Sequence, residues 1–339
     1  MIRVGAIDCG TNSIRLLIAD IDGADAEDTA AEGTDTVAAE VAAPTLTDVV
    51  REMDVVRLGY GVDRTGRIDP AAMERTLATA RRYAEACEEH GVVAVRFVAT
   101  SASRDASNAD EFIAGVRAAF AHYGIAPEVI SGSEEAALSF SGATGDVVAA
   151  GHPGPYLVCD IGGGSTELVL GEASATGPRV LQSYSADIGC VRMTERHLAS
   201  DPPTEAEIAA ACADIDAAVD AMVAAVDIEG AGTLVGLAGS ITTTTAHALR
   251  LPAYDPAQIH LAWVEPARIE ESAQELLAMS RQERAALGFM HPGRVDVIGA
   301  GALVWERIVA RVAAASPQVR VITSEHDILD GIALSIARR

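Results

Sequence analysis

The chain has 339 residues, of which 49% are hydrophobic, and its formal net charge is −24 because 49 acidic residues outnumber 25 basic ones. This length and hydrophobic content predict two ordinary domains with proper cores or one large domain, and they exclude disorder over most of the chain. All 25 basic residues are arginines, and the acidic balance disfavours nucleic acid as a partner, so an anionic substrate would need a local arginine-lined cleft.

The cysteine pattern and the apolar runs bear on the cellular setting. Five cysteines form no C-x-x-C pair and leave an odd number, which argues against a disulfide framework and a structural zinc site. The eight histidines are scattered and show no H-E-x-x-H metal spacing. No signal-peptide pattern opens the chain, and no apolar run approaches the length of a membrane span. The sequence therefore predicts a cytoplasmic protein with no membrane partner.

The first predicted element is a β-hairpin with a glycine-containing turn. A short apolar strand ends at Asp8, and a second strand runs from Ile14 to Ile21. The turn between them contains Gly10, Thr11, Asn12 and Ser13. Backbone N–H groups and hydroxyls of such a turn can converge on phosphate oxygens, and the leading carboxylate can reach a magnesium ion. The turn has no Walker lysine and opens no helix, so it is typical neither of a P-loop nor of a Rossmann fingerprint.

An αβ pattern follows the hairpin. Residues 22–44 are acidic and alanine-rich and predict a solvated surface insertion. The next predicted elements are a strand over 45–57, a helix between Asp69 and Gly91, a strand over 92–99, a helix over 109–122 and a strand over 127–130. Arg104 and the hydroxyls before it follow the strand at 92–99, so they should emerge at its carboxyl end, where ligands bind in open α/β sheets.

A pair of glutamates begins the next predicted helix. Ser133 is the predicted N-cap, which places Glu134 and Glu135 in the first turn. The helix dipole there favours the ionised carboxylate, and a glutamate held charged beside a phosphate cleft can take a proton from an attacking water. Glutamate is also common in first turns purely for capping, so the pattern leaves both interpretations open.

A second glycine hairpin repeats the first about 150 residues later. Its first strand ends at Asp160. Its turn and the start of its second strand contain Gly162, Gly163, Gly164, Ser165, Thr166 and Glu167. The repeated aspartate, glycine and hydroxyl chemistry predicts a duplicated domain with two anion-binding turns. Glu167 is a candidate to join Asp8 and Asp160 around a magnesium ion, and Arg15 and Arg192 are candidates to face the anion.

The remaining predicted elements repeat the alternation with longer helices. They are a strand near 179–185, helices over 190–199 and 204–226, a strand over 232–237, a helix from Gly239 and Ser240, helices around 265–286 and 294–314, a strand near 319–323 and a helix near 326–337. Glycines and prolines between Thr144 and Pro155 break the pattern, so we expect the domain boundary there.

Six segments of the chain resemble the motifs of one known family, in the same order. They are 7–15, 98–108, 130–136, 160–167, 189–195 and 236–243. The family is that of the exopolyphosphatases and guanosine pentaphosphate phosphatases (Ppx/GppA), and the chain resembles its short two-domain form. The resemblance implies an α/β, actin-like (ASKHA) fold of two ribonuclease-H-like domains with an interdomain cleft. It places the domains at 1–148 and 149–322, with the last helix, about 323–339, packing back on the first domain.

The resemblance also implies roles for the residues singled out above. Glu135 acts on the nucleophilic water, and the two glycine-rich loops hold phosphate and Mg²⁺. Together with the residues singled out above, this makes Asp8, Asp160 and, directly or through water, Glu167 the predicted ligands of Mg²⁺ or another divalent cation. The phosphate is bound by Gly10, Thr11, Asn12, Ser13, Arg15, Arg104, Gly162, Gly163, Gly164, Ser165, Thr166, Gly239 and Ser240. The chain departs from the family at 328–331, where Ile-Leu-Asp-Gly stands in place of an Arg-Glu-Gly element. It also has no room for the C-terminal HD-type helical region of the long members.

The expected activity is that of a phosphoric anhydride hydrolase, an exopolyphosphatase that releases orthophosphate from the end of linear inorganic polyphosphate. Three alternatives stay open at this point. The first is hydrolysis of pppGpp at the same site, which would connect the protein with the stringent response. The second is a non-catalytic sensor of polyphosphate or of the alarmones pppGpp and ppGpp, and the third is an ATP-using kinase of the same superfold. The sequence also leaves the chain-length preference and a homodimer undecided.

Overall fold

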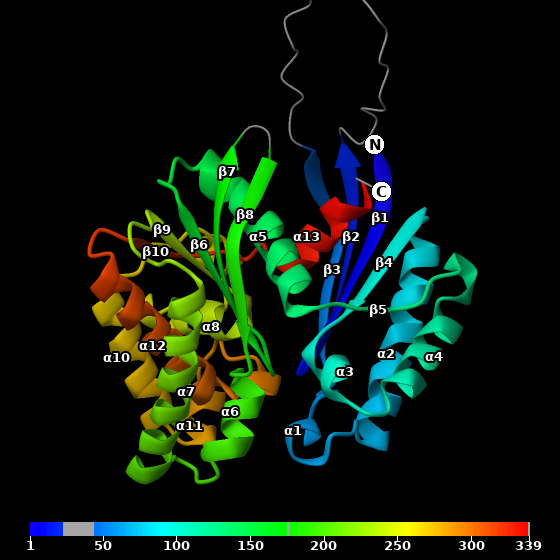
Figure 1. Cartoon of the computed structure of the whole chain (residues 1–339). Helices are drawn as coiled ribbons and strands as arrows, with labels where there is room; N and C mark the ends of the chain where they lie inside the picture. Colours follow the sequence, from blue (N-terminus) through cyan, green and yellow to red (C-terminus); the bar gives the residue numbers. More distant parts are fainter. Residues whose placement is uncertain (23–43, 175–176, 338–339) are drawn as a thin grey trace, which may run out of the picture.

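Two mixed five-stranded sheets with the same strand order form the framework of the chain (Figure 1). The computed structural model describes residues 1–22, 44–174 and 177–337. The first sheet has the order β3-β2-β1-β4-β5, with β1 Ile2–Cys9, β2 Ser13–Asp22, β3 Thr45–Val55, β4 Ala94–Ala99 and β5 Glu128–Val129. The second has the order β8-β7-β6-β9-β10, with β6 Tyr156–Ile161, β7 Thr166–Ser174, β8 Gly177–Ala186, β9 Thr233–Leu237 and β10 Arg320–Thr323.

Strand pairing is the same in the two sheets. β1 pairs antiparallel with β2 and parallel with β4, and β6 pairs antiparallel with β7 and parallel with β9. The duplication predicted from the two hairpins is therefore confirmed, and the chain has the α/β, actin-like fold of two ribonuclease-H-like halves. The acidic insertion predicted at 22–44 lies outside the described residues except for its two end residues.

Helices cover both sheets and lie between them. The longer ones are α2 Pro70–Glu89, α4 Ala109–Ala119, α5 Gly132–Ala149, α6 Cys190–His197, α7 Glu205–Ala225, α8 Ala238–Ala248, α10 Pro266–Ala278, α12 Ile298–Ala315 and α13 Ile328–Ile336. The short ones are α1 Val62–Thr65, α3 Ser101–Asp105, α9 Pro256–Ile259 and α11 Arg281–Ala285. Among the residues that the structure describes, no helix has both the length and the apolar content that crossing a membrane requires.

The central strand of the first sheet is buried on both faces, because successive side chains of a strand point to opposite sides. Ile7 and Cys9 enter a core that α2 and α4 complete, whereas Val4 and Ala6 enter a core with α13. In the second half, α6, α7 and α12 cover one face of the sheet and α5 packs on the other. Each half therefore has its own hydrophobic cores.

α5 and α13 lie between the two sheets (Figure 1). α5 buries Leu138 in a core of the first sheet and Phe140 in a core of the second. The two helices pack with their backbones almost in contact, since a Cβ added to Gly331 would lie 2.0 Å from the carbonyl oxygen of Leu138. The chain passes from the first sheet to the second through α5 and returns from β10 to α13.

Several predicted boundaries differ from the structure for local reasons. The N-cap of α5 is Ser131, not Ser133, and its hydroxyl accepts the backbone N–H of Glu134. The single helix predicted around 265–286 is two, because Ser280 forms a capping box that starts α11. The helix predicted from 294 begins at Ile298, since a 3₁₀ turn at 292–294 precedes it.

Candidate active site between the two sheets

A cavity of about 100 Å³ lies where the two glycine hairpins meet. The predicted site residues that line it are Asp8, Gly10, Thr11, Asn12, Ser13, Arg15, Glu135, Asp160, Gly162, Gly163, Ser165, Gly239 and Ser240. They come from both sheets and from the starts of α5 and α8. The cavity is also lined by Thr100, Ser101, Cys190 and Arg294. Polar groups far apart in the sequence thus share one partly open cavity.

The two hairpin turns have the same internal bond and touch each other. The N–H of Gly10 donates to the carbonyl of Ser13 at 2.9 Å, and the N–H of Gly162 donates to that of Ser165 at 3.0 Å. A Cβ on Gly163 would lie 2.8 Å from Thr11 Cβ and 3.1 Å from the backbone nitrogen of Asn12. The second turn therefore needs glycine where it meets the first, a role for glycine that is separate from backbone conformation.

Four of the predicted site residues do not line the cavity. Gly164 packs against Thr11 and Ser101, and the hydroxyl of Thr166 donates to the carbonyl of Ile188. Arg104 lies behind Glu135, to which it donates at 3.3 Å. The fourth residue is Glu167, which is buried next to the cavity and accepts a 2.7 Å bond from Ser185.

Arg192 was predicted to face the anion, and this is wrong. Its guanidinium binds Asp63 at 2.9 Å and Asp105 at 2.5 Å. Asp63 lies in α1 and Asp105 in α3, so the arginine of α6 ties the second half to the first. These carboxylates could not be paired with Arg192 from the sequence, because they lie 129 and 87 residues away.

The structure separates the two adjacent glutamates at the start of α5. Glu135 is buried and lines the cavity. The side chain of Glu134 is 46% exposed and pairs with Arg96 at 2.7 Å, away from the cavity. Of the two, only Glu135 can reach a water molecule held between the hairpins.

The buried carboxyl groups around the cavity share a raised pKa. Burial raises the pKa of Glu135 well above its ordinary value, and the charge of Glu167 adds to the effect. Burial, followed by the charge of Asp327, raises the pKa of Asp160 to about 6. Burial also raises the pKa of Asp8, although Arg15 opposes it. Bringing these groups together as anions is costly unless a positive charge offsets them.

The positive groups at the cavity are two arginines. Arg15 donates to Asp8 at 2.6 Å and also pairs with Asp327, the N-cap of α13. Arg294 was missed by the sequence analysis, which placed it at the start of a helix. It lies against the Gly239 turn, where an added Cβ would be 2.3 Å from its Cζ. Among the described residues it forms no salt bridge and donates to the hydroxyl of Thr243 at 3.2 Å, so its charge is available to a ligand.

A divalent cation fits this donor set in part. Carboxylate oxygens are ligands that Mg²⁺ prefers. The raised pKa values of the buried carboxyl groups show that their negative charges are unfavourable together, and a bound cation would relieve this repulsion. The ligand atoms of the predicted trio Asp8, Asp160 and Glu167 do not all lie within 4.8 Å of one another. Within the described ranges, the only group of three histidine, cysteine or acidic residues that meets this criterion is Asp146, His260 and His326. Mg²⁺ commonly keeps waters and substrate phosphate oxygens as its other ligands, so one or two carboxylates suffice.

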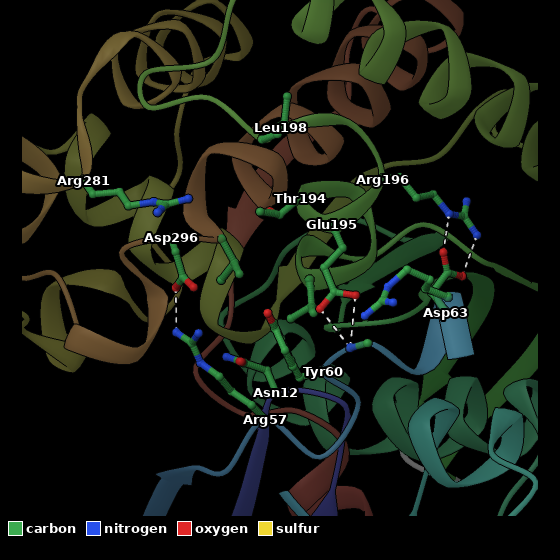
Figure 2. Close-up of a pocket in the computed structure, with 15 residues that line it drawn as sticks. Asn12, Arg57, Tyr60, Asp63, Thr194, Glu195, Arg196, Leu198, Arg281 and Asp296 are labelled. Carbon is green, nitrogen blue, oxygen red and sulfur yellow. Dashed lines mark hydrogen bonds and ion pairs between the residues drawn. The ribbon is translucent and has the colours of Figure 1, made fainter. Parts of the chain in front are cut away.

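A larger cavity of about 580 Å³ adjoins the first (Figure 2). The two share Asn12 and Val297 as lining residues. Its basic residues are Arg57, Arg64, Arg196 and Arg281. Arg57 pairs with Asp296 at 2.7 Å and Arg196 with Asp63 at 2.8 Å, whereas the other two form no salt bridge within the described ranges. Tyr60, which is 58% exposed, stands in the same cavity.

Replacing Glu167 by glutamine is expected to stabilise the protein at alkaline pH. Burial, followed by the charge of Asp160, raises the pKa of this carboxyl from 4.5 to about 8. The folded state then holds the proton more tightly than the unfolded chain, so the free energy of unfolding falls as the pH rises from 4.5 through about 8. Glutamine cannot ionise and keeps an oxygen for the Ser185 hydroxyl.

The measurement is the Tm in cation-free buffer at two pH values. At pH 9 we expect the Tm of Glu167→Gln to exceed that of the wild type by at least about 2–4 °C, the shift that ~1 kcal/mol produces. At pH 4 to 5 the two should differ little. Glu172→Gln, on the same strand but exposed, should change neither value. If the Tm of Glu167→Gln exceeded that of the wild type equally at both pH values, the stabilisation would not come from the ionisation of Glu167.

Comparison with known proteins gives one consistent result. Residues 36–337 match the Ppx/GppA phosphatase family. The chain is similar to exopolyphosphatase 2 of Mycobacterium tuberculosis, with 49% identity over 99% of this chain and 98% of that protein. It is 31% identical, over 87% of its length and 52% of the relative, to a guanosine-5'-triphosphate,3'-diphosphate pyrophosphatase of Aeromonas salmonicida. A crystal structure of an exopolyphosphatase-like protein superposes with a TM-score of 0.88 at 42% identity, covering 100% of this chain and 99% of the other.

Proposed function

Because the chain belongs to the Ppx/GppA phosphatase family, we propose that it is an exopolyphosphatase that releases terminal orthophosphate from linear inorganic polyphosphate. The observation that carries the proposal is the convergence of both glycine hairpins and Glu135 on one cavity. The end-to-end similarity to a protein named exopolyphosphatase 2 supports the same activity.

The residues of the cavity supply what hydrolysis of a phosphoanhydride needs. The N–H groups and hydroxyls of the two turns bind the oxygens of the terminal phosphate, and Arg294 offsets their charge. Glu135 accepts a proton from a water molecule as its oxygen attacks the phosphorus, and the anhydride bond to the remaining chain breaks. Arg104, at 3.3 Å from Glu135, holds this carboxylate in place. Orthophosphate and a chain one unit shorter leave.

A divalent cation such as Mg²⁺ would be held by Asp8 and Asp160 and would supply charge neutralisation at the phosphate oxygens. Ser139 donates to Asp160 at 2.7 Å and Arg15 donates to Asp8, so both carboxylates have fixed orientations. Glu167 is buried without lining the cavity and is bonded to Ser185, and its raised pKa of about 8 means that it adds negative charge only when a cation lowers that pKa or at alkaline pH. We propose for it a positioning role near the cation.

The larger cavity is the proposed path for the rest of the polyphosphate chain. It adjoins the small cavity at Asn12 and presents Arg64 and Arg281 without carboxylate partners among the described residues. Arg-to-phosphate bonds there would bind a longer substrate outside the reacting centre. A cytoplasmic location and a homodimer remain predictions.

Hydrolysis of pppGpp at the same site is the second candidate. Two observations favour it: the Aeromonas relative bears the name of a guanosine-5'-triphosphate,3'-diphosphate pyrophosphatase, and Tyr60 presents an exposed ring on which a base can stack. Phosphate release from polyphosphates of graded length and from pppGpp, with Mg²⁺ and with a chelator, separates the two. Faster release from pppGpp under the same conditions would replace the first proposal by the second, and cation-dependent release from either excludes a non-catalytic sensor.

Arg281→Gln is expected to raise the KM for long polyphosphate about tenfold, with kcat little changed. A charge-assisted hydrogen bond of about 1.5 kcal/mol corresponds to that factor, and the contact lies outside the reacting centre. Tripolyphosphate, which reaches little beyond the small cavity, should show a much smaller change. Arg117→Gln, on the exposed side of α4, is the matched control. A loss of kcat with both substrates would contradict the proposed path.

A further inference from the structure

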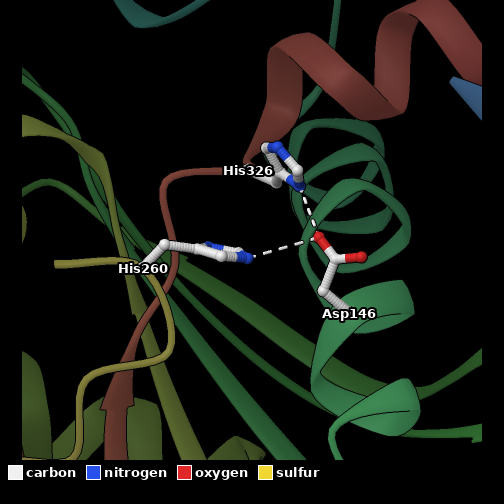
Figure 3. A group of neighbouring side chains, drawn as sticks. All are labelled: Asp146, His260 and His326. Carbon is white, nitrogen blue, oxygen red and sulfur yellow. Dashed lines mark hydrogen bonds and ion pairs between the residues drawn. The ribbon is translucent and has the colours of Figure 1, made fainter. Parts of the chain in front are cut away.

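Three side chains outside the proposed active site come together in a group that sequence spacing did not reveal (Figure 3). They are Asp146, His260 and His326, and all three are half-buried. His326 Nδ1 lies 2.6 Å from Asp146 Oδ2, and His260 Nε2 lies 3.4 Å from the same oxygen. Figure 3 shows both rings directing a nitrogen at the carboxylate. The histidines are scattered along the sequence, as described above, but the fold brings these two together.

The trio joins the segments through which the chain passes between the sheets. Asp146 lies in the last turn of α5, which leads from the first sheet to the second. His326 lies between β10 and α13, where the chain returns. His260 follows α9 in the second half, next to the strand-like contact of Trp263 with Ile322. A ligand bound by all three therefore connects α5 and the segment between β10 and α13 to the segment after α9 in the second half.

We propose that Asp146, His260 and His326 bind a divalent transition metal ion of the Zn²⁺ class. The bound ion would stabilise the two segments that connect the halves, α5 and the segment between β10 and α13. Two imidazoles and one carboxylate, with a water as fourth ligand, form a known donor set for such ions. With metal–ligand bonds of about 2.0–2.1 Å, tetrahedral ligand atoms lie roughly 3.3–3.4 Å apart. The separation between His260 and Asp146 already equals this value, and His326 needs to withdraw by less than about 1 Å.

The surroundings set what kind of ion the site takes and how tightly. Mg²⁺ prefers oxygen ligands, so two imidazoles favour a softer ion and separate this site from the carboxylates of the active site. The backbone N–H of Glu325 donates to His260 Nδ1 at 3.3 Å. When Nε2 binds a metal the ring proton sits on Nδ1, so this long contact is given up. We expect reversible binding rather than a permanently held ion.

The test is Zn²⁺ binding to the whole chain, measured by competition with a chromogenic chelator in excess Mg²⁺. The wild type should bind one equivalent at this site, and Asp146→Asn, His260→Gln and His326→Gln should each weaken its binding at least about tenfold. His197→Gln is the matched control, because His197 and Asp214 form a similar pair at 2.8 Å for which the described part of the chain offers no third ligand. Co²⁺ in place of Zn²⁺ should give the visible absorption of a four-coordinate ion in the wild type and in the control alone.

A second measurement keeps the proposal independent of the active site and of its proposed chemistry. Zn²⁺ should raise the Tm of the wild type and of the His197 variant by at least about 2 °C, and it should not raise that of the three ligand variants. Tm values in chelator show whether each variant folds. The proposal is overturned if the wild type binds no Zn²⁺ in the presence of excess Mg²⁺, or if the three ligand variants bind Zn²⁺ as tightly as the wild type does.

Discussion

Glu135→Gln is expected to lower the rate of phosphate release from polyphosphate at least ~100-fold, the usual scale for the loss of a general base. Glutamine has nearly the same shape and keeps an oxygen for Arg104, which lies 3.3 Å away, but it cannot accept the proton of the attacking water. Because the wild-type carboxyl has a pKa raised by burial and by the charge of Glu167, the variant also removes a buried ionisable group. We therefore expect a Tm equal to or above that of the wild type at pH 8.

The adjacent glutamate provides the matched control for this variant. Glu134→Gln changes the same residue type in the same helical turn, but its side chain is directed at Arg96 and lies outside the cavity. Initial rates at saturating substrate and Mg²⁺, together with Tm values, should leave Glu134→Gln close to the wild type. If Glu135→Gln retained full activity, or if both variants lost activity equally, Glu135 would not be the base.

The pKa values predict where the activity of the wild type declines with acid. Glu135 acts only as the ionised base, and its raised pKa shifts the loss of activity to a pH above that of an ordinary carboxyl group. A bound cation lowers the pKa values of neighbouring carboxyls, so the acidic limb should move to lower pH as Mg²⁺ is increased.

The fold could be predicted largely because its signals are local. An apolar strand, an aspartate and a glycine turn can be read within fifteen residues, and their repetition indicates duplication. The pairing of β1 with β2 and of β6 with β7 follows from that pattern alone. The break between α10 and α11 was also readable, since Ser280 and Glu283 have the spacing of a capping box. The helical period of the apolar residues continues across this break, so the period alone does not show where α10 ends.

The contacts between the halves were beyond the sequence because they join residues with no fixed spacing. Arg294 reaches the cavity from a 3₁₀ turn that precedes α12, and Asp327 reaches Arg15 across 312 residues. The same holds for His260 and His326. His326 meets Asp146 because α5 and α13 pack together, and His260 because the segment after α9 is bonded to β10 through Leu261 and Thr323. Residue type indicated which groups could bind an anion or a metal, but packing decides which of them meet.

The close approach of the two hairpins leads to the second large effect, an expected loss of roughly 100-fold in kcat/KM for Gly163→Ala. The added Cβ would lie 2.8 Å from Thr11 Cβ and 3.1 Å from the backbone nitrogen of Asn12, neither of which can rotate away. The turns would have to separate, and a displacement of about 1 Å in a reacting geometry can cost about 10²-fold.

Stability should fall less than activity in this variant, because the clash lies between the halves and each half keeps its own cores. Gly145→Ala is the control, since an added Cβ there meets nothing within 4 Å and alanine favours the helix. Steady-state rates on polyphosphate and Tm values measure both effects. Wild-type kcat/KM in a folded Gly163→Ala protein would mean that the turns need not meet for the reaction, and the cavity they enclose would then not be where phosphate is released.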